Sequence, residues 1–442
     1  MWRTSLVVAL VVIGLLLRII HLGEVRPIEW DERTFFQVGV SLLRVGVPAT
    51  WSIFSGVYHG HASINCGDVT YAVVIPYLDH PPLFSLLVGL WSYAVGMRDF
   101  CALDWALVRV VMIFIAALSF GAVYLLTQKV FGETLATFSL LAFVFFPSHV
   151  VAARFVTPEH LIALLLMLGL YLFAVFETTR SPSLRRLVVF LMGALCLGSP
   201  LTKLSGVVVS ASLVLLAFTK RHYWLGVLLC WASLLSALLF VGYGWYYDWD
   251  AFRSVLAAHH NRGQTFVHFW TLFTTLDLGN NFSLFDPSVI AGLVGALGLA
   301  LSTKRGAGAY VYIPLIVFSF LYLYVAPWEA YGWYKYSLFP LVAVGLGFMF
   351  TQLYSNNAVY LALFLPLLSM MLQQSALLSD QADRRLMVGV FYAAALLPVV
   401  MGSRLLQLRV VFIPLLILLF AFEVLWVFRI FQYPLLDVLV YR

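Results

Sequence analysis

Apolar runs long enough to cross a lipid bilayer recur along almost the whole of this 442-residue chain. A helix needs about 20 residues to cross about 30 Å of hydrocarbon. Hydrophobic residues make up 63% of the sequence and charged residues only 10%, so a water-soluble fold could not cover its surface with polar groups. The sequence therefore predicts an all-α polytopic membrane protein.

A hydropathy window of membrane-spanning length places about thirteen transmembrane helices along the chain. The first apolar run follows Arg3 as in a signal peptide, but no small-residue cleavage site follows it, so we expect a retained helix. The predicted spans are 4–22, 107–127, 134–152, 160–177, 187–202, 204–219, 223–244, 288–302, 308–326, 336–353, 357–373, 386–402 and 410–428.

One further apolar stretch, 81–97, is long enough either to cross the membrane or to lie along its surface. If it does not cross, the basic loops at 178–186, 220–221, 304–305 and 404–409 all fall on the same side as the N-terminus. That arrangement satisfies the positive-inside rule. We therefore expect an interfacial helix at 81–97 and a multi-pass protein of the cell (plasma) membrane with a cytoplasmic N-terminus.

This topology predicts one transmembrane domain, 1–442, with no separate soluble domain. The first external loop, 23–106, and a second external loop, 245–287, then lie on the same extracytoplasmic face. The net charge of +6 comes from basic residues scattered over short loops, which does not indicate a nucleic-acid partner.

The four cysteines are too few and too dispersed for a disulfide framework or a zinc site. Cys196 and Cys230 lie inside apolar segments, which predicts small core residues. Cys66 and Cys101 fall on the same predicted external side and could pair in an oxidising compartment, but the sequence leaves the pairing open.

Ionisable residues gather near the external ends of the predicted spans. Such groups at membrane depth cost roughly several kcal/mol each unless they are paired or functional. A polar cavity with both signs of charge suits an anionic ligand beside a catalytic carboxylate. The residues concerned are Asp31, Glu32, Arg33, Asp79, His80, Arg109, Arg154, Glu159, Lys203, Arg262 and Lys335.

In their order and topology these residues resemble the motifs of the GT-C superfamily of membrane glycosyltransferases. Within it the chain is similar to the group of protein O-mannosyltransferases and lipid A aminoarabinose transferases. The resemblance covers most of the chain and implies a GT-C fold with interfacial helices in the first external loop. It rests on Asp31-Glu32, His80-Pro81-Pro82-Leu83, Arg109, Arg154–Glu159, Leu201-Thr202-Lys203 and Tyr334-Lys335-Tyr336-Ser337-Leu338-Phe339-Pro340.

The resemblance implies an inverting glycosyltransferase that takes a sugar from a dolichyl- or undecaprenyl-phosphate donor. The acceptor would be a lipid, a glycan or a protein at the extracytoplasmic membrane face, and membrane lipids would surround the enzyme. Asp31 is then the candidate general base, with Glu32 holding or assisting it. The same acidic pair could instead cap a helix that begins near Thr34.

Arg109, Lys203 and Lys335 are, by the same resemblance, expected to bind the donor phosphate. Long basic side chains at span ends also reach toward lipid headgroups, which is the alternative for these cations. No cofactor is certain; a divalent metal is possible, and its ligands are unknown. The other site candidates are His80, Arg154, Glu159 and Tyr336.

Two aromatic segments, Tyr243–Trp249 and Trp328–Tyr336, could line a groove for a lipid or a sugar ring, or form an interfacial belt. A lipid or glycolipid transporter would also need a charged cavity among many helices and is the alternative function. Transporters often contain internal repeats, and the sequence shows none.

Overall fold

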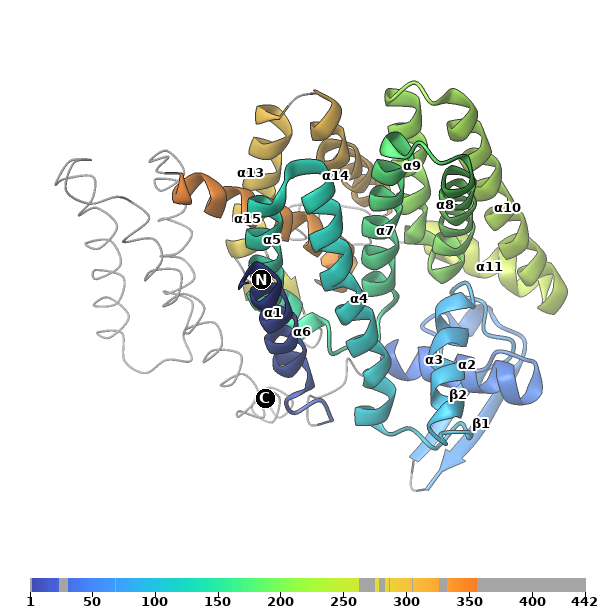
Figure 1. The fold of residues 1–442 in the computed structure, drawn as a ribbon. Coiled ribbons are helices and arrows are strands. Elements are labelled where there is room, and N and C mark those ends of the chain that lie inside the picture. The colour runs from blue at the N-terminus through green and yellow to red at the C-terminus, as the bar shows by residue number, and fades with distance from the viewer. Residues whose placement is uncertain are drawn as a thin grey trace.

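The computed structural model describes residues 2–23, 31–67, 69–261, 275–277, 283–285, 287–303, 305–325 and 332–355. Apolar helices form the body of the molecule (Figure 1). In chain order they are α1 (Trp2–Ile19), α4 (Trp105–Phe131), α5 (Glu133–Phe145), α6 (Pro147–Ala152), α7 (Pro158–Thr178), α8 (Pro182–Thr202), α9 (Val207–Thr219), α10 (Tyr223–Tyr247), α13 (Pro287–Ser302), α14 (Arg305–Val325) and α15 (Phe339–Tyr354).

Smaller elements lie between these helices. The 3₁₀ turns η2 (Leu204–Gly206) and η3 (Gly332–Leu338) lead into α9 and α15. The segment between α1 and α4 holds α2 (Asp31–Val45), η1 (Ser55–Val57), β1 (His61–Cys66), β2 (Val69–Val74) and α3 (Leu83–Ala94). After α10 come α11 (Trp249–His260) and the strands β3 (Thr275–Asp277) and β4 (Ser283–Phe285), which pair antiparallel.

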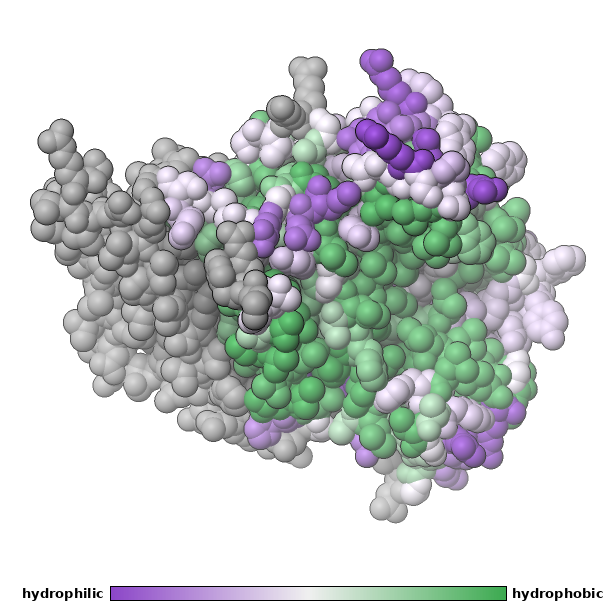
Figure 2. Space-filling view, in the orientation of Figure 1, coloured by the Kyte–Doolittle hydropathy of each residue, from purple (hydrophilic) through white to green (hydrophobic). Residues whose placement is uncertain are grey.

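Most of the predicted spans that lie within the described residues agree with these helices. Within the described ranges, each predicted span from 4–22 to 336–353 overlaps one α-helix, except 134–152, which holds two. Five described helices are both long and apolar enough to cross a membrane, and several others are apolar but shorter. Figure 2 shows a hydrophobic band over the helices, with hydrophilic residues gathered at the two ends. The predicted spans 357–373, 386–402 and 410–428 lie outside the described residues.

The predicted span 134–152 is not one helix. α5 ends at Phe145 and α6 begins at Pro147, which occupies the first turn of the new helix. Proline lacks a backbone N–H and disfavours helical geometry at the residue before it, so the chain breaks there.

Arg18, which interrupts the first apolar run, is fully buried at this break. Its guanidinium donates to the carbonyl oxygens of Val144 and Phe143, 3.2 and 3.1 Å away, and contacts Nδ1 of His149 at 2.7 Å. The last carbonyls of a helix have no partner within the helix and carry its negative dipole end. The end of α5 therefore solvates a cation that would otherwise be costly at this depth.

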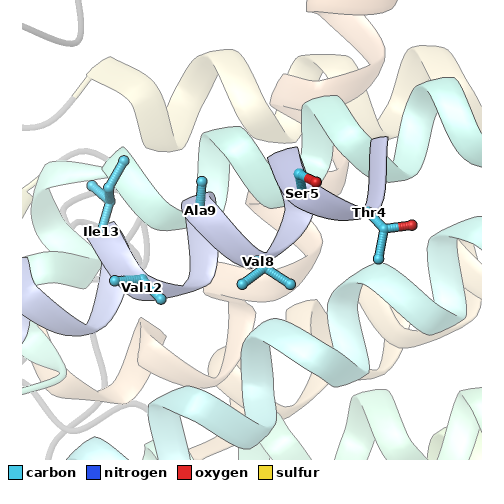
Figure 3. Close-up of a pocket in the computed structure, with 6 residues that line it drawn as sticks. All are labelled: Thr4, Ser5, Val8, Ala9, Val12 and Ile13. Atoms are coloured by element: carbon cyan, nitrogen blue, oxygen red, sulfur yellow. The ribbon is translucent and has the colours of Figure 1, made fainter. Parts of the chain in front are cut away.

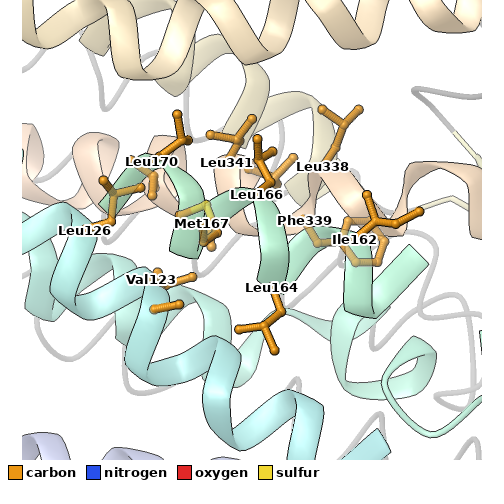
Figure 4. Close-up of a cluster of buried hydrophobic side chains, with 14 of the residues drawn as sticks. Val123, Leu126, Ile162, Leu164, Leu166, Met167, Leu170, Leu338, Phe339 and Leu341 are labelled. Atoms are coloured by element: carbon orange, nitrogen blue, oxygen red, sulfur yellow. The ribbon is translucent and has the colours of Figure 1, made fainter. Parts of the chain in front are cut away.

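α7 lies at the centre of the main core, between α4 and the η3–α15 segment. Figure 4 shows Val123 and Leu126 of α4 facing Met167 and Leu170 of α7, with Phe339 of α15 on another side. All five side chains are at most 3% exposed. This dense packing fixes the start of α7, where the site candidates Arg154 and Glu159 lie.

α2 and α3 cross with their backbones in direct contact at one end of the helical body (Figure 1). A Cβ atom added to Gly39 would lie 2.0 Å from the carbonyl oxygen of Ser85 and 2.8 Å from Cα of Gly89. Small residues at a crossing allow this approach. α3 is only 12 residues, or about 18 Å, long, which is too short to cross a bilayer. Its predicted position along the membrane surface stays a prediction.

The β1–β2 hairpin is fastened to the body by a disulfide between Cys66 and Cys101. Strands β1 and β2 pair antiparallel, with Cys66 opposite Val69. The pairing that the sequence left open is therefore present. Of the other two cysteines, Cys196 is buried as expected, whereas the prediction for Cys230 was wrong. Cys230 is exposed on the outward side of α10, where an apolar residue can face lipid.

Candidate functional site

The acidic pair Asp31-Glu32 opens α2. The helix begins at Asp31, three residues before the expected start near Thr34, so both carboxylates lie in its first turn. The exposed N–H groups and the dipole of a helix N-terminus favour negative charge there. Asp31 is half-buried and Glu32 is fully buried. Neighbours in sequence, the two carboxylates thus have different surroundings.

Glu32 is locked into the interior by Arg109 of α4. Nε of Arg109 donates to Oε2 of Glu32 at 3.0 Å, and Nη2 donates to Oε1 at 2.8 Å. The backbone N–H of Val156 donates a further hydrogen bond to Oε2, 3.0 Å long. Neither charged side chain has any exposed surface. The structure shows the Arg109 guanidinium bound within the fold. Its predicted contact with a donor phosphate stays a prediction.

Arg109 and Arg154 also bind backbone carbonyls at the end of α1. Nη1 of Arg109 donates to the carbonyl oxygen of Leu22 at 2.8 Å, and Nη2 of Arg154 donates to that of Leu17. Arg154 lies between α6 and α7 and is fully buried. Together these contacts tie the end of α1 to the start of α2, α4 and α7.

A second ion pair joins Glu159 of α7 to Lys203, which follows α8. Nζ of Lys203 lies 2.5 Å from Oε1 of Glu159. The Glu159 side chain is 1% exposed and that of Lys203 is 10% exposed. Oε2 of Glu159 is buried and has no hydrogen-bond partner in the described part of the chain. One carboxylate oxygen of this pair therefore lacks a hydrogen bond, and we call the pair unsaturated. We call the pair of Glu32 and Arg109 saturated, because both oxygens of Glu32 accept hydrogen bonds.

Lys203 interacts electrostatically with Asp31 and lies against the η3 turn. The Asp31 carboxylate attracts the Lys203 ammonium electrostatically, and Nζ of Lys203 lies 4.8 Å from the ring centre of Tyr334. Lys335, the next residue of η3, is 1% exposed. The ring of Tyr336 stacks on that of His160 at 4.9 Å between centroids. Segments distant in the sequence thus place cations and carboxylates at one end of the bundle.

Asp79, in the loop before α3, is held by hydrogen bonds from two hydroxyl groups. Its carboxylate accepts hydrogen bonds from the Ser52 hydroxyl at 2.6 Å and the Tyr58 hydroxyl at 2.5 Å. Burial, followed by the charge of Asp79, raises the pKa of the Tyr77 phenol well above its ordinary value, and Asp31 contributes in the same direction. The Tyr77 hydroxyl therefore keeps its proton at any working pH and remains a hydrogen-bond donor near Asp31.

His80 lies among aromatic rings. Its ring stacks on Phe35 of α2 at 5.9 Å between centroids and lies 6.1 Å from the ring of His259 of α11. Tyr77 meets it edge-on at 6.3 Å. These contacts hold the imidazole ring between α2, α11 and the loop before α3.

The described residues contain no group of three or more His, Cys, Asp or Glu side chains that could hold a metal ion. A shallow hollow of about 500 Å³ lies along α1, lined mainly by apolar side chains (Figure 3). The lining residues Thr4, Ser5, Val8, Ala9, Val12 and Ile13 include none of the predicted site residues.

The structure brings some predicted residues together and separates others. Asp31, Glu159 and Lys203 form one electrostatic group, and Lys335 follows Tyr334, whose ring faces Lys203. Glu32 and Arg109 form a separate closed pair. Sequence reasoning did not single out Tyr77, although it lies three residues before His80.

Comparison with known proteins finds similarity in structure alone. Neither a protein-family model nor a curated protein sequence matches the chain. The structure of ArnT from Cupriavidus metallidurans bound to undecaprenyl phosphate is similar, with a TM-score of 0.61 at 17% identity, over 97% of this chain and 77% of ArnT. Its apo structure matches with a TM-score of 0.60 at 16% identity, over 98% of this chain and 77% of ArnT.

A second solved structure points to the same fold. The oligosaccharyltransferase from Archaeoglobus fulgidus, in its apo form, matches with a TM-score of 0.52 at 11% identity. The match covers 93% of this chain, which spans about half of that protein, 55% of its length. The chain has the GT-C fold. The GT-C fold predicted from the sequence is thereby confirmed.

Proposed function

We propose that this GT-C protein is an inverting glycosyltransferase that uses a polyprenyl-phosphate-linked sugar. The observation that supports the proposal is the buried Lys203–Glu159 ion pair, whose ammonium group is attracted electrostatically by the Asp31 carboxylate. Such a transfer needs a base for the acceptor and a cation for the phosphate leaving group. ArnT, whose fold is similar, has been solved with undecaprenyl phosphate bound, which supports a lipid phosphate of this class as ligand.

In the proposed reaction Asp31 takes the proton from an acceptor hydroxyl or amine. The acceptor oxygen or nitrogen forms a bond to the anomeric carbon of the sugar. The bond between that carbon and the phosphate oxygen breaks, and the polyprenyl phosphate leaves with both electrons. Because the acceptor attacks opposite the leaving group in one displacement, the configuration inverts. The acceptor is a lipid, a glycan or a protein.

The cations divide into two groups in this proposal. Lys203 and Lys335 stabilise the charge that develops on the leaving phosphate. Arg109 holds Glu32 and thereby the first turn of α2, because its side chain has no exposed surface. Glu159 orients Lys203, and its second oxygen remains available to accept a hydrogen bond from a substrate. His80, Arg154 and Tyr336 support the surrounding segments.

We further propose that the chain has about thirteen spans and that this site faces the extracytoplasmic side of the plasma membrane. Disulfides persist in oxidising compartments, and the Cys66–Cys101 bond lies in the same external loop as Asp31. α8 carries Arg185 and Arg186 in its first turns and ends at Thr202, next to Lys203. Its 21 residues span about 31 Å, so those arginines lie at the opposite end, as the positive-inside rule requires for a cytoplasmic face.

The test is sugar transfer by the purified full-length protein in nanodiscs. Labelled undecaprenyl-phosphate-linked mannose and aminoarabinose serve as donors, and extracted cell-envelope lipids and glycans serve as acceptors. Wild-type protein is expected to transfer label, and Asp31→Asn to reduce the rate about 10²- to 10⁴-fold, the usual contribution of a positioned general base. Full activity of a folded Asp31→Asn variant would rule out the proposed role of Asp31.

A further inference from the structure

The Tyr243 hydroxyl of α10 is buried and has no hydrogen-bond partner among the described residues. Most buried polar side-chain atoms in folded proteins are paired, and an orphan one calls for an explanation. A phenol placed this way in a membrane protein is costly to keep, since phenylalanine would fill the same space without an unpaired group.

Tyr243 packs against the same buried cluster as Leu201, which lies two residues before Lys203 of the proposed site. That cluster includes Tyr77 and Tyr58, in the loops before α3, and Phe252 of α11. Tyr77 interacts electrostatically with both Asp31 and Tyr243. The Tyr77 phenol thus links the proposed base on α2 to the unpaired hydroxyl on α10.

Neighbouring tyrosines show that the fold can satisfy a phenol here. The Tyr58 hydroxyl donates to Asp79 and accepts from the backbone N–H of Leu78 at 2.9 Å. The Tyr247 hydroxyl, one helical turn after Tyr243, donates to the carbonyl oxygen of Gly46 at 2.7 Å. The rings of Tyr243 and Tyr247 meet edge-on with their centroids 5.0 Å apart. The unpaired state therefore belongs to Tyr243 in particular.

We propose that the Tyr243 hydroxyl binds a hydroxyl group of the sugar carried by the donor; this rests on the proposed glycosyltransferase function. A phenol both donates and accepts a hydrogen bond, as a sugar hydroxyl does. The polyprenyl tail offers no such group, and the phosphate is matched by the ammonium groups of Lys203 and Lys335. A site that hydrogen-bonds a substrate hydroxyl discriminates strongly against ligands that lack it.

The experiment compares three ligands that differ only by the sugar. Binding of undecaprenyl phosphate, undecaprenyl-phosphate-linked mannose and undecaprenyl-phosphate-linked aminoarabinose is measured by calorimetry on the full-length protein in phosphatidylcholine nanodiscs. The variants are wild type, Tyr243→Phe and the matched control Tyr247→Phe. For the sugar lipid that wild type binds more tightly than undecaprenyl phosphate, Tyr243→Phe is expected to weaken binding about 3- to 10-fold, as for one neutral hydrogen bond. Its affinity for undecaprenyl phosphate should be unchanged.

Thermal stability gives the second readout. Tyr243→Phe should leave the melting temperature unchanged or raise it, because no internal hydrogen bond is lost. Tyr247→Phe should lower it through the lost bond to Gly46. Equal binding of the sugar lipid by Tyr243→Phe and wild type would overturn the inference. So would a lowered melting temperature for Tyr243→Phe, or sugar lipids that bind wild type no better than undecaprenyl phosphate. Failure of wild type to bind undecaprenyl phosphate would instead overturn the proposed function.

Discussion

Two buried ion pairs lie within a few turns of each other in this protein, and they differ in how completely they are satisfied. Glu32 and Arg109 have no exposed surface, and both carboxylate oxygens accept hydrogen bonds. Glu159 keeps one buried oxygen unpartnered in the described structure, and Lys203 retains 10% exposure with Asp31 near by. We infer that the saturated pair holds the fold and the unsaturated pair meets the substrate.

The difference follows from where each pair is placed. Glu32 and Arg109 connect α2 to α4 and reach the end of α1 through Leu22, so they fasten three segments at once. Lys203 instead ends α8 in extended backbone, with Asp31 and the Tyr334 ring beside it. A buried charge that is partly available is a costly arrangement unless a ligand completes it.

The largest expected effect comes from breaking the saturated pair. Arg109→Ala leaves Glu32 buried without its cation and should lower the free energy of unfolding by about 3–5 kcal/mol, measured in mixed detergent micelles. The double variant Glu32→Leu/Arg109→Met removes both charges and should recover much of that loss. A folded Arg109→Ala protein of near wild-type stability, with only its ligand affinity reduced, would contradict the assignment.

Removing the cation of the unsaturated pair should weaken ligand binding, in addition to the stability lost when Glu159 is left buried without its cation. Lys203→Met is expected to weaken the binding of undecaprenyl phosphate about 10- to 100-fold, the loss of one charge-assisted hydrogen bond. Glu159→Gln keeps the ammonium and is the matched control, with a smaller change expected. Titration of both variants in nanodiscs provides the measurement. Unaltered affinity in Lys203→Met would place the phosphate elsewhere.

An exposed pair provides the smallest expected effect. Arg44 and Asp99 pair at the surface, where their side chains are 54% and 51% exposed. A hydrogen bond from the backbone N–H of Cys101, opposed by slight burial and aided by Arg44, lowers the pKa of Asp99 below 3.8. Its contribution to stability is therefore present above about pH 4 and is lost as the pH falls through the lower folded-state value.

Solvent screening makes that contribution small. Arg44→Ala should change the free energy of unfolding by less than about 1 kcal/mol, as is usual for exposed pairs. Unfolding of the variant and wild type at pH 7 and pH 3 is the check, and the difference between them should shrink at the lower pH. If Arg44→Ala lowered the free energy of unfolding as much as Arg109→Ala does, ion pairs would not stabilise this fold according to their burial and their hydrogen bonds.

Sequence reasoning predicted the helical architecture well because apolar runs of membrane length are a local signal. It misplaced two helix boundaries. α2 begins at Asp31, not near Thr34, and Pro147 divides the predicted span 134–152. The proline was visible in the sequence, but the continuous apolar pattern outweighed it in the hydropathy window.

The sequence indicated which residues could belong to the site better than it indicated which of them bind each other. Glu32 and Arg109 are 77 residues apart, and nothing in their spacing indicates that they bind each other. Cys66 and Cys101, 35 residues apart, could pair or remain free on sequence grounds alone. The unpaired state of the Tyr243 hydroxyl depends on packing between α10 and the loops before α3, which no local pattern records.

A structure of the full-length protein with undecaprenyl phosphate in nanodiscs tests the central distinction most directly. We expect the phosphate within hydrogen-bond distance, about 3 Å, of Nζ of Lys203, with Asp31 adjacent and the Glu32–Arg109 pair unchanged. A phosphate bound to Arg109, with Glu32 displaced and Lys203 still held only by Glu159, would contradict this expectation.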